Sequence, residues 1–116
     1  MKQCFDWAEG INCAVTVADR DCVILYQNEQ AREVYRNHGN LIGKSMLQCH
    51  NPRSQAIIAR ILSEGCSNAY TITKNGRKKI IYQTPWRNDN GEIAGIAEFS
   101  MVIPDQMPHY NRDKPS

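Results

Sequence analysis

The hydrophobic positions of this chain change from strand-like to helical spacing and back again. Residues 12–18 and 22–27 are rich in β-branched and apolar residues, and the short polar run Asp19–Asp21 between them favours a tight turn. We therefore expect two strands that pair as a hairpin. Asn28 follows them and is a suitable N-cap for a short helix.

The clearest helical segment is residues 52–64. Asn51 is a good N-cap, proline suits the first helical position, and Gly65 supplies the stop. Polar side chains such as Gln55 are expected to face water. The apolar residues recur at helical spacing and should form one buried face, made of Ile57, Ile58, Ile61 and Leu62.

Three further segments read as strands, namely residues 66–74, 77–87 and 92–103. Asn75-Gly76 is a strong hairpin signal, because both central residues of a type I′ turn need positive φ. The last segment alternates between apolar and polar residues, so one of its faces should be core. We expect that core face to carry Ile93, Ala97, Phe99, Met101 and Ile103, with Glu98 and Ser100 on the opposite face.

Helices that interrupt an antiparallel sheet must cover one of its faces, which predicts an α+β domain. The expected architecture is a five-stranded antiparallel sheet, with helices inserted between strands 2 and 3 and covering one face. Residues 1–104 are expected to form this single domain, and residues 105–116 a polar, proline-containing tail.

Composition narrows the possible functions. The chain has 116 residues and a net charge of +2, which is too small to imply a polyanionic partner, so we expect no nucleic-acid binding. No stretch is long and apolar enough for a membrane span, and the start of the chain lacks the apolar segment of a secretion signal. The five cysteines include no CxxC pair, so no zinc site or disulfide framework is predicted. Together these features favour a cytoplasmic protein with reduced thiols.

Two segments resemble PAS (Per-Arnt-Sim) domains in addition to the element order. They are D-R-D-C-V-I-L-Y-Q-N-E-Q-A at residues 19–31 and L-I-G-K-S at residues 41–45. Within the family, C-H-N-P-R-S at residues 49–54 looks most like a branch with a Cys-His-x-Pro-x-Ser motif, which includes hemerythrin-linked and small stand-alone PAS proteins. The ending around His109 is also similar to the stand-alone proteins, although we assign no role to it.

The resemblance implies a stand-alone sensory or interaction module that binds a small ligand or a partner protein and signals through dimerisation or protein contacts. In the family, a segment before the first strand helps to form dimers, which marks Phe5 and Trp7 as a homodimer interface. Candidate ligand contacts are the residues that could line a cavity between the helices and the sheet: Cys49, His50, Ile57, Ile61, Tyr70, Tyr82, Trp86 and Phe99.

Two other functions stay open at this point. Some PAS domains bind haem through an axial histidine, so His50 with Cys49 could serve a haem- or thiol-based redox or gas sensor. Light-sensing relatives use a cysteine at the position of Met46, so no flavin photoadduct is expected. A small cone-fold enzyme or ligand carrier is the other alternative. No catalytic motif or metal motif is present, so we expect no enzyme.

Overall fold

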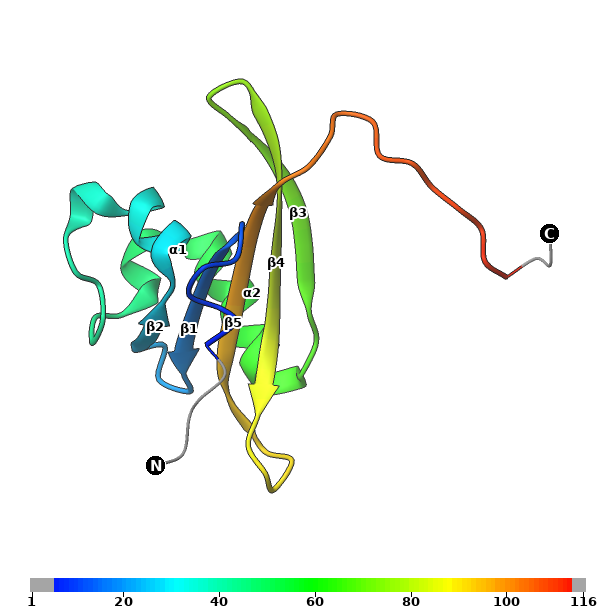
Figure 1. Cartoon of the computed structure of the whole chain (residues 1–116). Coiled ribbons are helices and arrows are strands. Elements are labelled where there is room, and N and C mark those ends of the chain that lie inside the picture. Colours follow the sequence, from blue (N-terminus) through cyan, green and yellow to red (C-terminus); the bar gives the residue numbers. More distant parts are fainter. Residues whose placement is uncertain (1–5, 114–116) are drawn as a thin grey trace.

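The structure is a computed structural model that describes residues 6–113, except for the side chain of Cys49 (Figure 1). Within these residues the chain forms strands, two α-helices and two short 3-10 helices, labelled η. Their order along the chain is β1 (Ala14–Asp19), β2 (Ile24–Gln27), α1 (Glu29–Val34), η1 (Arg36–His38), η2 (Met46–Cys49), α2 (Pro52–Glu64), β3 (Asn68–Lys74), β4 (Arg77–Arg87) and β5 (Ile93–Val102).

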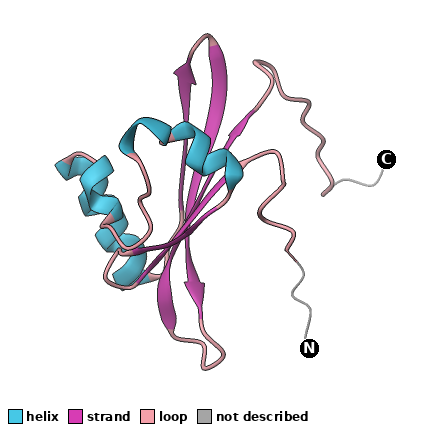
Figure 2. Ribbon diagram, turned by 60° about the vertical axis from the view of Figure 1, so that its left-hand side comes forward, coloured by secondary structure: helices cyan, strands magenta, loops and turns pink. Residues whose placement is uncertain are grey.

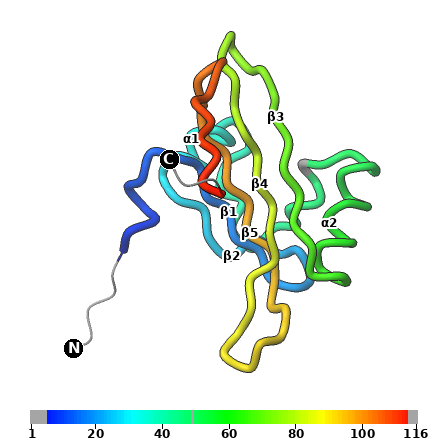
Figure 3. Tube along the Cα trace, turned by 90° about the vertical axis from the view of Figure 1, so that its right-hand side faces the viewer, coloured from blue at the N-terminus to red at the C-terminus, as the bar shows by residue number. Residues whose placement is uncertain are grey.

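The five strands form one antiparallel sheet with the order β2-β1-β5-β4-β3. All four helices come between β2 and β3 in sequence, and α1 and α2 pack against the sheet. In Figure 2 the helices lie beside the strands and cross in front of them, and in Figure 3 helix α2 stands to the right of the sheet. We call the sheet face under the helices the inner face and the opposite face the outer face. The predicted fold class is confirmed.

Short polar residues and a glycine make the connections. In the turn between β1 and β2, Oδ1 of Asp19 accepts hydrogen bonds from the backbone N–H groups of Asp21 at 2.9 Å and Val23 at 3.0 Å. At the tip of the β3–β4 hairpin, Asn75 and Gly76 have φ angles of 53° and 74°. Both are positive, as the expected type I′ turn requires.

Asn28 joins the end of β2 to the start of α1 and is fully buried. Its Oδ1 accepts from the backbone N–H of Ala31 at 3.0 Å, which caps the helix, and from that of Val15 at 2.9 Å. Its Nδ2 donates to the carbonyls of Ala8 and Cys13, each at 2.8 Å. One side chain therefore ties the start of α1 to β1 and to the segment before it.

Helix α2 has the predicted bounds. Oδ1 of Asn51 accepts from the N–H of Ser54 at 2.8 Å, and Gly65 closes the helix with a φ of 74°. Of its predicted apolar face, Ile58 and Ile61 are buried, while Ile57 and Leu62 are partly buried against the core. Gln55 does not face only water, because it bonds the loop before the helix.

The core lies between α2 and the inner face, and it corrects the predicted orientation of β5. Ile96 is fully buried and packs with the helix, whereas Phe99 and Met101 lie on the outer face. Glu98 and Ser100 share the inner face with Ile96 because strand side chains alternate. The buried core cluster consists of Ala18, Cys22, Ile24, Leu41, Met46, Ile58, Ile61 and Ile96.

Both ends of the described chain run outside the sheet (Figure 1). The segment before β1 is anchored by Glu9, whose carboxylate accepts hydrogen bonds from the Tyr26 hydroxyl and the Arg32 guanidinium. Residues 103–113 follow β5 without forming a helix or strand. None of the helices in the described part of the chain is long and apolar enough to cross a membrane.

Candidate functional site

A row of polar side chains crosses the inner face, with one residue from each strand. Thr16 pairs in register with Gln27 on one side and Glu98 on the other, Glu98 pairs with Gln83, and Gln83 pairs with Asn68. We call this set the polar row. Residues that pair directly across neighbouring strands point to the same face, so the register alone brings these five together.

Hydrogen bonds join most of the polar row. Nε2 of Gln27 donates to Oγ1 of Thr16 at 3.2 Å, Nδ2 of Asn68 donates to Oε1 of Gln83 at 3.0 Å, and Nε2 of Gln83 donates to Oε2 of Glu98 at 2.8 Å. Gln83 is 2% exposed and Gln27 3%. In the described part of the chain, no buried side-chain nitrogen or oxygen lacks a hydrogen-bond partner. The polar row therefore does not carry the energetic cost of a buried polar atom without a partner.

His50 lies over the centre of the polar row. Its Nε2 is 3.8 Å from Oε2 of Glu98, and the two side chains are only 12% and 11% exposed. The loop that carries His50 is held by Gln55, whose Nε2 donates to the carbonyls of His50 and Leu47, each at 3.0 Å. An imidazole and a carboxylate therefore meet at the inner face in a fixed geometry.

Two cavities adjoin the polar row. The smaller has a volume of about 10 Å³ and is bounded by the imidazole of His50, the Glu98 carboxylate, Thr16 and Gln27. The larger, which we call the inner cavity, has a volume of about 210 Å³. Thr16, Tyr35 and Glu98 line both. The other walls of the inner cavity are Ala14, Val34, His38, Ile72, Lys74, Lys79, Ile81 and Ser100.

Of the residues predicted to contact a ligand, the structure brings His50 and Tyr70 to the inner face. Tyr70 pairs with Ile81 and is 40% exposed, and it lines neither cavity of the polar row. Partial burial and the charge of Glu98 raise the pKa of its phenol. Ile61 is fully buried and Ile57 half-buried in the core against α2. These two residues line none of the cavities along the polar row.

Three aromatic residues lie elsewhere than expected. Tyr82 pairs with Phe99, and Trp86 pairs with Gly95, so all three aromatic side chains lie on the outer face. Nε1 of Trp86 donates to the carbonyl of Ala18 at 3.0 Å. Their expected position in the helix-covered cavity is therefore corrected, since the pairing register places Gln83 and Glu98 there instead.

The predicted roles of Cys49, Phe5 and Trp7 are not tested by the structure. Cys49 ends η2, but its side chain lies outside the described part of the structure, so its thiol chemistry stays a prediction. Phe5 also lies outside the described residues, and Trp7 is 51% exposed. The homodimer role of these two aromatic residues is likewise untested.

On the side of His50 that faces the sheet, the geometry is not that of a haem site. Nε2, which an axial ligand would offer to iron, lies 3.8 Å from Oε2 of Glu98, and the space there has a volume of only about 10 Å³. A separate cavity of about 540 Å³ is lined by His50 together with Tyr35, His38, Leu41, Lys44 and Gln48, and a haem role for His50 stays a prediction. In residues 6–113, moreover, no group of three or more His, Cys, Asp or Glu residues is placed to hold a metal ion. The arrangement suits hydrogen bonding better than metal ligation.

The residues at the centre of this site are not apparent from the sequence pattern. Hydrophobic alternation places Glu98 on the face opposite the core, and it does not single out Thr16, Gln27 or Asn68. The sequence does contain a signal for this site, because isolated polar residues recur inside strands that are otherwise apolar. Such residues usually face solvent, but here they form hydrogen bonds with one another inside the protein.

A five-stranded antiparallel sheet with helices over one face places the chain in the class of small α+β domains. The model of the PAS fold family matches residues 8–106, and the chain belongs to that family. The family is typical of sensory modules in kinases and receptors. Nothing in these matches assigns the chain to the Cys-His-x-Pro-x-Ser branch, which stays a prediction.

Solved structures share the fold at low sequence identity. The PAS domain of histidine kinase ThkA has 16% identity and a TM-score of 0.63, covering 78% of this chain and 99% of that one. The PAS domain of Bordetella pertussis BvgS has 17% identity and a TM-score of 0.65, covering 86% and 83%. VqmA bound to DPO has 19% identity and a TM-score of 0.69, covering 84% of this chain but 54% of VqmA. A search of curated proteins finds no match.

Proposed function

We propose that this PAS domain is a sensory module that binds a small polar molecule in the inner cavity, against the polar row. One observation carries the proposal. Oε2 of Glu98 is engaged by Gln83 and lies near His50, while no hydrogen bond from a described side chain or from the described backbone reaches its Oε1. Because Glu98 also lines the inner cavity, that oxygen is available to a ligand N–H or O–H group. The fold similarity to VqmA, which was solved bound to DPO, supports a ligand-binding role.

The proposed module is not an enzyme. Catalysis requires several convergent titratable groups in defined roles. The polar row offers one carboxylate and the nearby imidazole of His50, and its other members are neutral amides and a hydroxyl. Such a set suits recognition by hydrogen bonding.

The binding proposal is tested by thermal unfolding of the full chain with a panel of small polar compounds. A ligand present at a hundred times its Kd adds about 2.7 kcal/mol of stability, which raises Tm by about 10 °C in a domain of this size. Glu98→Gln should abolish the rise. Glu92→Gln should keep it, because Glu92 is exposed in the β4–β5 turn and its substitution removes the same charge.

Native mass spectrometry of the protein, purified without added ligand, supplies a second readout by detecting bound mass directly. Stabilisation that is equal in the wild type and in Glu98→Gln would contradict the proposed site. So would a panel in which no compound raises Tm while the purified protein carries no bound mass.

For signal output we propose self-association or partner contact through the outer face and the segment before β1. Tyr82 is 42% exposed there and Met101 36%, and they lie on adjacent strands of the outer face. Trp7, itself half exposed, precedes β1. Sedimentation velocity should show weaker association for Trp7→Ala than for the control Tyr110→Ala, in which an exposed aromatic of the tail is removed. An identical concentration dependence in the wild type and Trp7→Ala would refute this role for Trp7.

A further inference from the structure

Three cations gather on the inner side of the β3–β4 hairpin. Lys74 pairs directly with Arg77, and Lys79 pairs with Ile72 two residues further along the same strands. Because alternate residues share a face, all three cations lie on the side of the sheet that faces the helices. Lys78 pairs with Thr73 and lies on the opposite side. The cations of the hairpin are therefore divided between the two faces of the sheet, with three of them on the side of the helices.

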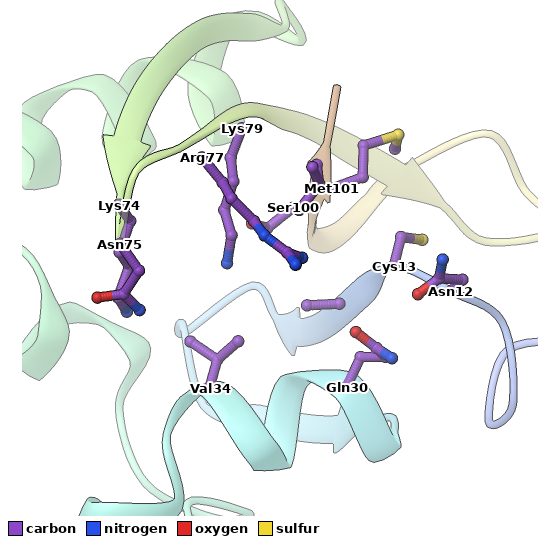
Figure 4. Close-up of a pocket in the computed structure, with 12 residues that line it drawn as sticks. Asn12, Cys13, Gln30, Val34, Lys74, Asn75, Arg77, Lys79, Ser100 and Met101 are labelled. Carbon is purple, nitrogen blue, oxygen red and sulfur yellow. The ribbon is translucent and has the colours of Figure 1, made fainter. Parts of the chain in front are cut away.

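The three cations line a cleft of about 690 Å³ between the hairpin and α1. Figure 4 shows the side chains of Arg77 and Lys79 extending from the hairpin towards the cleft, with Val34 and Gln30 on α1 across from them. We call this space the basic cleft. No Asp or Glu of the described residues lines it.

The basic cleft adjoins the inner cavity. Ala14, Val34, Lys74, Lys79 and Ser100 line both spaces, so the two spaces share walls. Glu98 lines only the inner cavity and Arg77 only the basic cleft, so a molecule that occupied both spaces would have cations near one end and the Glu98 side chain near the other.

The charges in the basic cleft are not balanced by the protein. Within residues 6–113, the side chains of Lys74, Arg77 and Lys79 take part in none of the ion pairs, which join Arg32 to Glu9, Arg36 to Glu33, His50 to Glu98 and Arg60 to Glu64. Like charges directly opposite each other on a sheet are destabilising. Cys13 also lines the cleft, but burial raises the pKa of its thiol, so it adds no negative charge.

We propose that the ligand is a small organic anion whose carboxylate or phosphate group binds Lys79, Arg77 and Lys74 in the basic cleft while its body enters the inner cavity. This inference rests on the proposed function and names its ligand class. Charge-assisted hydrogen bonds from ammonium and guanidinium groups are the strong way to hold such a group. The inner cavity, at about 210 Å³, suits a body no larger than a single ring with short substituents.

A nucleic acid is the competing occupant of a basic surface. Single strands are usually held by cations together with aromatic side chains on which bases stack. No aromatic residue of the described chain lines the basic cleft, and its cations lie on the concave side of the hairpin. The geometry favours a small anion.

The test uses the full chain and matched probes. The anions are 4-hydroxybenzoate and phenyl phosphate, and 4-hydroxybenzamide is the neutral counterpart of 4-hydroxybenzoate. The hydroxyl group of 4-hydroxybenzoate and 4-hydroxybenzamide supplies the donor whose hydrogen bond Glu98 is proposed to accept. Affinities are measured by titration calorimetry or NMR shifts at fixed ionic strength. Lys79→Gln should weaken the binding of both anions by about tenfold or more, as expected for the loss of one charge-assisted contact. Lys78→Gln removes the same charge from the other face of the same strand and should change their affinity by less than about twofold.

Several outcomes would overturn the proposal. Equal weakening by Lys78→Gln and Lys79→Gln would mean that binding follows net charge alone. Failure of both anions to bind at millimolar concentration would also overturn it. A short single-stranded oligonucleotide that binds in a Lys79-dependent way, without competition from phenyl phosphate, would assign the cleft to nucleic acid instead.

Failure of this inference is distinguishable from failure of the proposed function. If 4-hydroxybenzamide and 4-hydroxybenzoate bind equally and only Glu98→Gln weakens them, the inner-cavity site stands and the anion site does not. If the affinity for 4-hydroxybenzoate depends on Lys79 but is unchanged by Glu98→Gln, the anion site stands and binding against the polar row does not.

Discussion

Replacing Asn28 by alanine should destabilise the domain more than removing an ordinary helix cap. The Oδ1 of Asn28 caps α1, and loss of such a cap costs about 1 kcal/mol. The Oδ1 of Asn28 also accepts a hydrogen bond from the buried backbone N–H of Val15. The pairing of β1 with β2 begins only at Thr16, so no residue of β2 can accept from this N–H. A buried N–H without an acceptor costs about 1–3 kcal/mol. The total loss expected for Asn28→Ala is therefore about 2–4 kcal/mol.

Asn51→Ala is the matched control, because Asn51 caps α2 with one exposed bond to the N–H of Ser54. Its expected cost is about 1 kcal/mol. Urea unfolding followed by circular dichroism measures both losses, and an unchanged slope would show that the midpoint shift reports stability. In thermal scans, Asn28→Ala should lower Tm by about 10 °C or more, against about 5 °C for Asn51→Ala. Equal losses in the two variants would refute the reasoning that the Val15 N–H depends on Asn28.

Two further predictions concern a close backbone contact and an exposed carboxylate. A Cβ on Gly95 would lie 2.0 Å from the carbonyl oxygen of Ala18 and 2.5 Å from Nε1 of Trp86. Gly95→Ala should therefore lower the free energy of unfolding by about 3 kcal/mol or more and change tryptophan fluorescence. Unchanged stability would contradict this close contact. Hydrogen bonds from Arg32 and Tyr26 hold the pKa of Glu9 below its usual range. The anchoring of the segment before β1 is therefore fully present above the ordinary carboxyl pKa, and it is lost as the pH falls through the lowered pKa of Glu9. The Glu29 amide donates to the Glu9 carbonyl, so its protection factor against hydrogen exchange should fall on acidification in the wild type and depend less on pH in Glu9→Gln. Identical pH profiles of the protection factor in the two proteins would count against this coupling.

The sequence predicts the local features of this fold well, because their causes are local. Asn51, Pro52 and Gly65 set the bounds of α2, and they do so through bonds within four residues along the chain. Asn75-Gly76 fixes the β3–β4 hairpin for the same reason. The order of elements then restricts the architecture to a sheet with helices over one face.

The candidate site is less accessible to sequence reasoning, because the pairing register creates it. Thr16 and Glu98 are far apart in sequence and become neighbours only when β1 pairs with β5. A shift of one residue would send every side chain of a strand to the other face. Hydrophobic alternation in β5 favoured the wrong face, since Phe99 and Met101 are more apolar than Glu98 and Ser100.

That misassignment itself points to function. A fold built for stability alone would place the apolar face of β5 under the helices, because burying a polar group without a partner costs several kcal/mol. Here the side chain of Glu98 is only 11% exposed under the helical layer, with Gln83 bonded to its Oε2 and His50 nearby. Sites that break a local rule of this kind are where functional demands are expected to lie. The orientation of β5 thus supports ligand binding at the inner face independently of the size of any cavity.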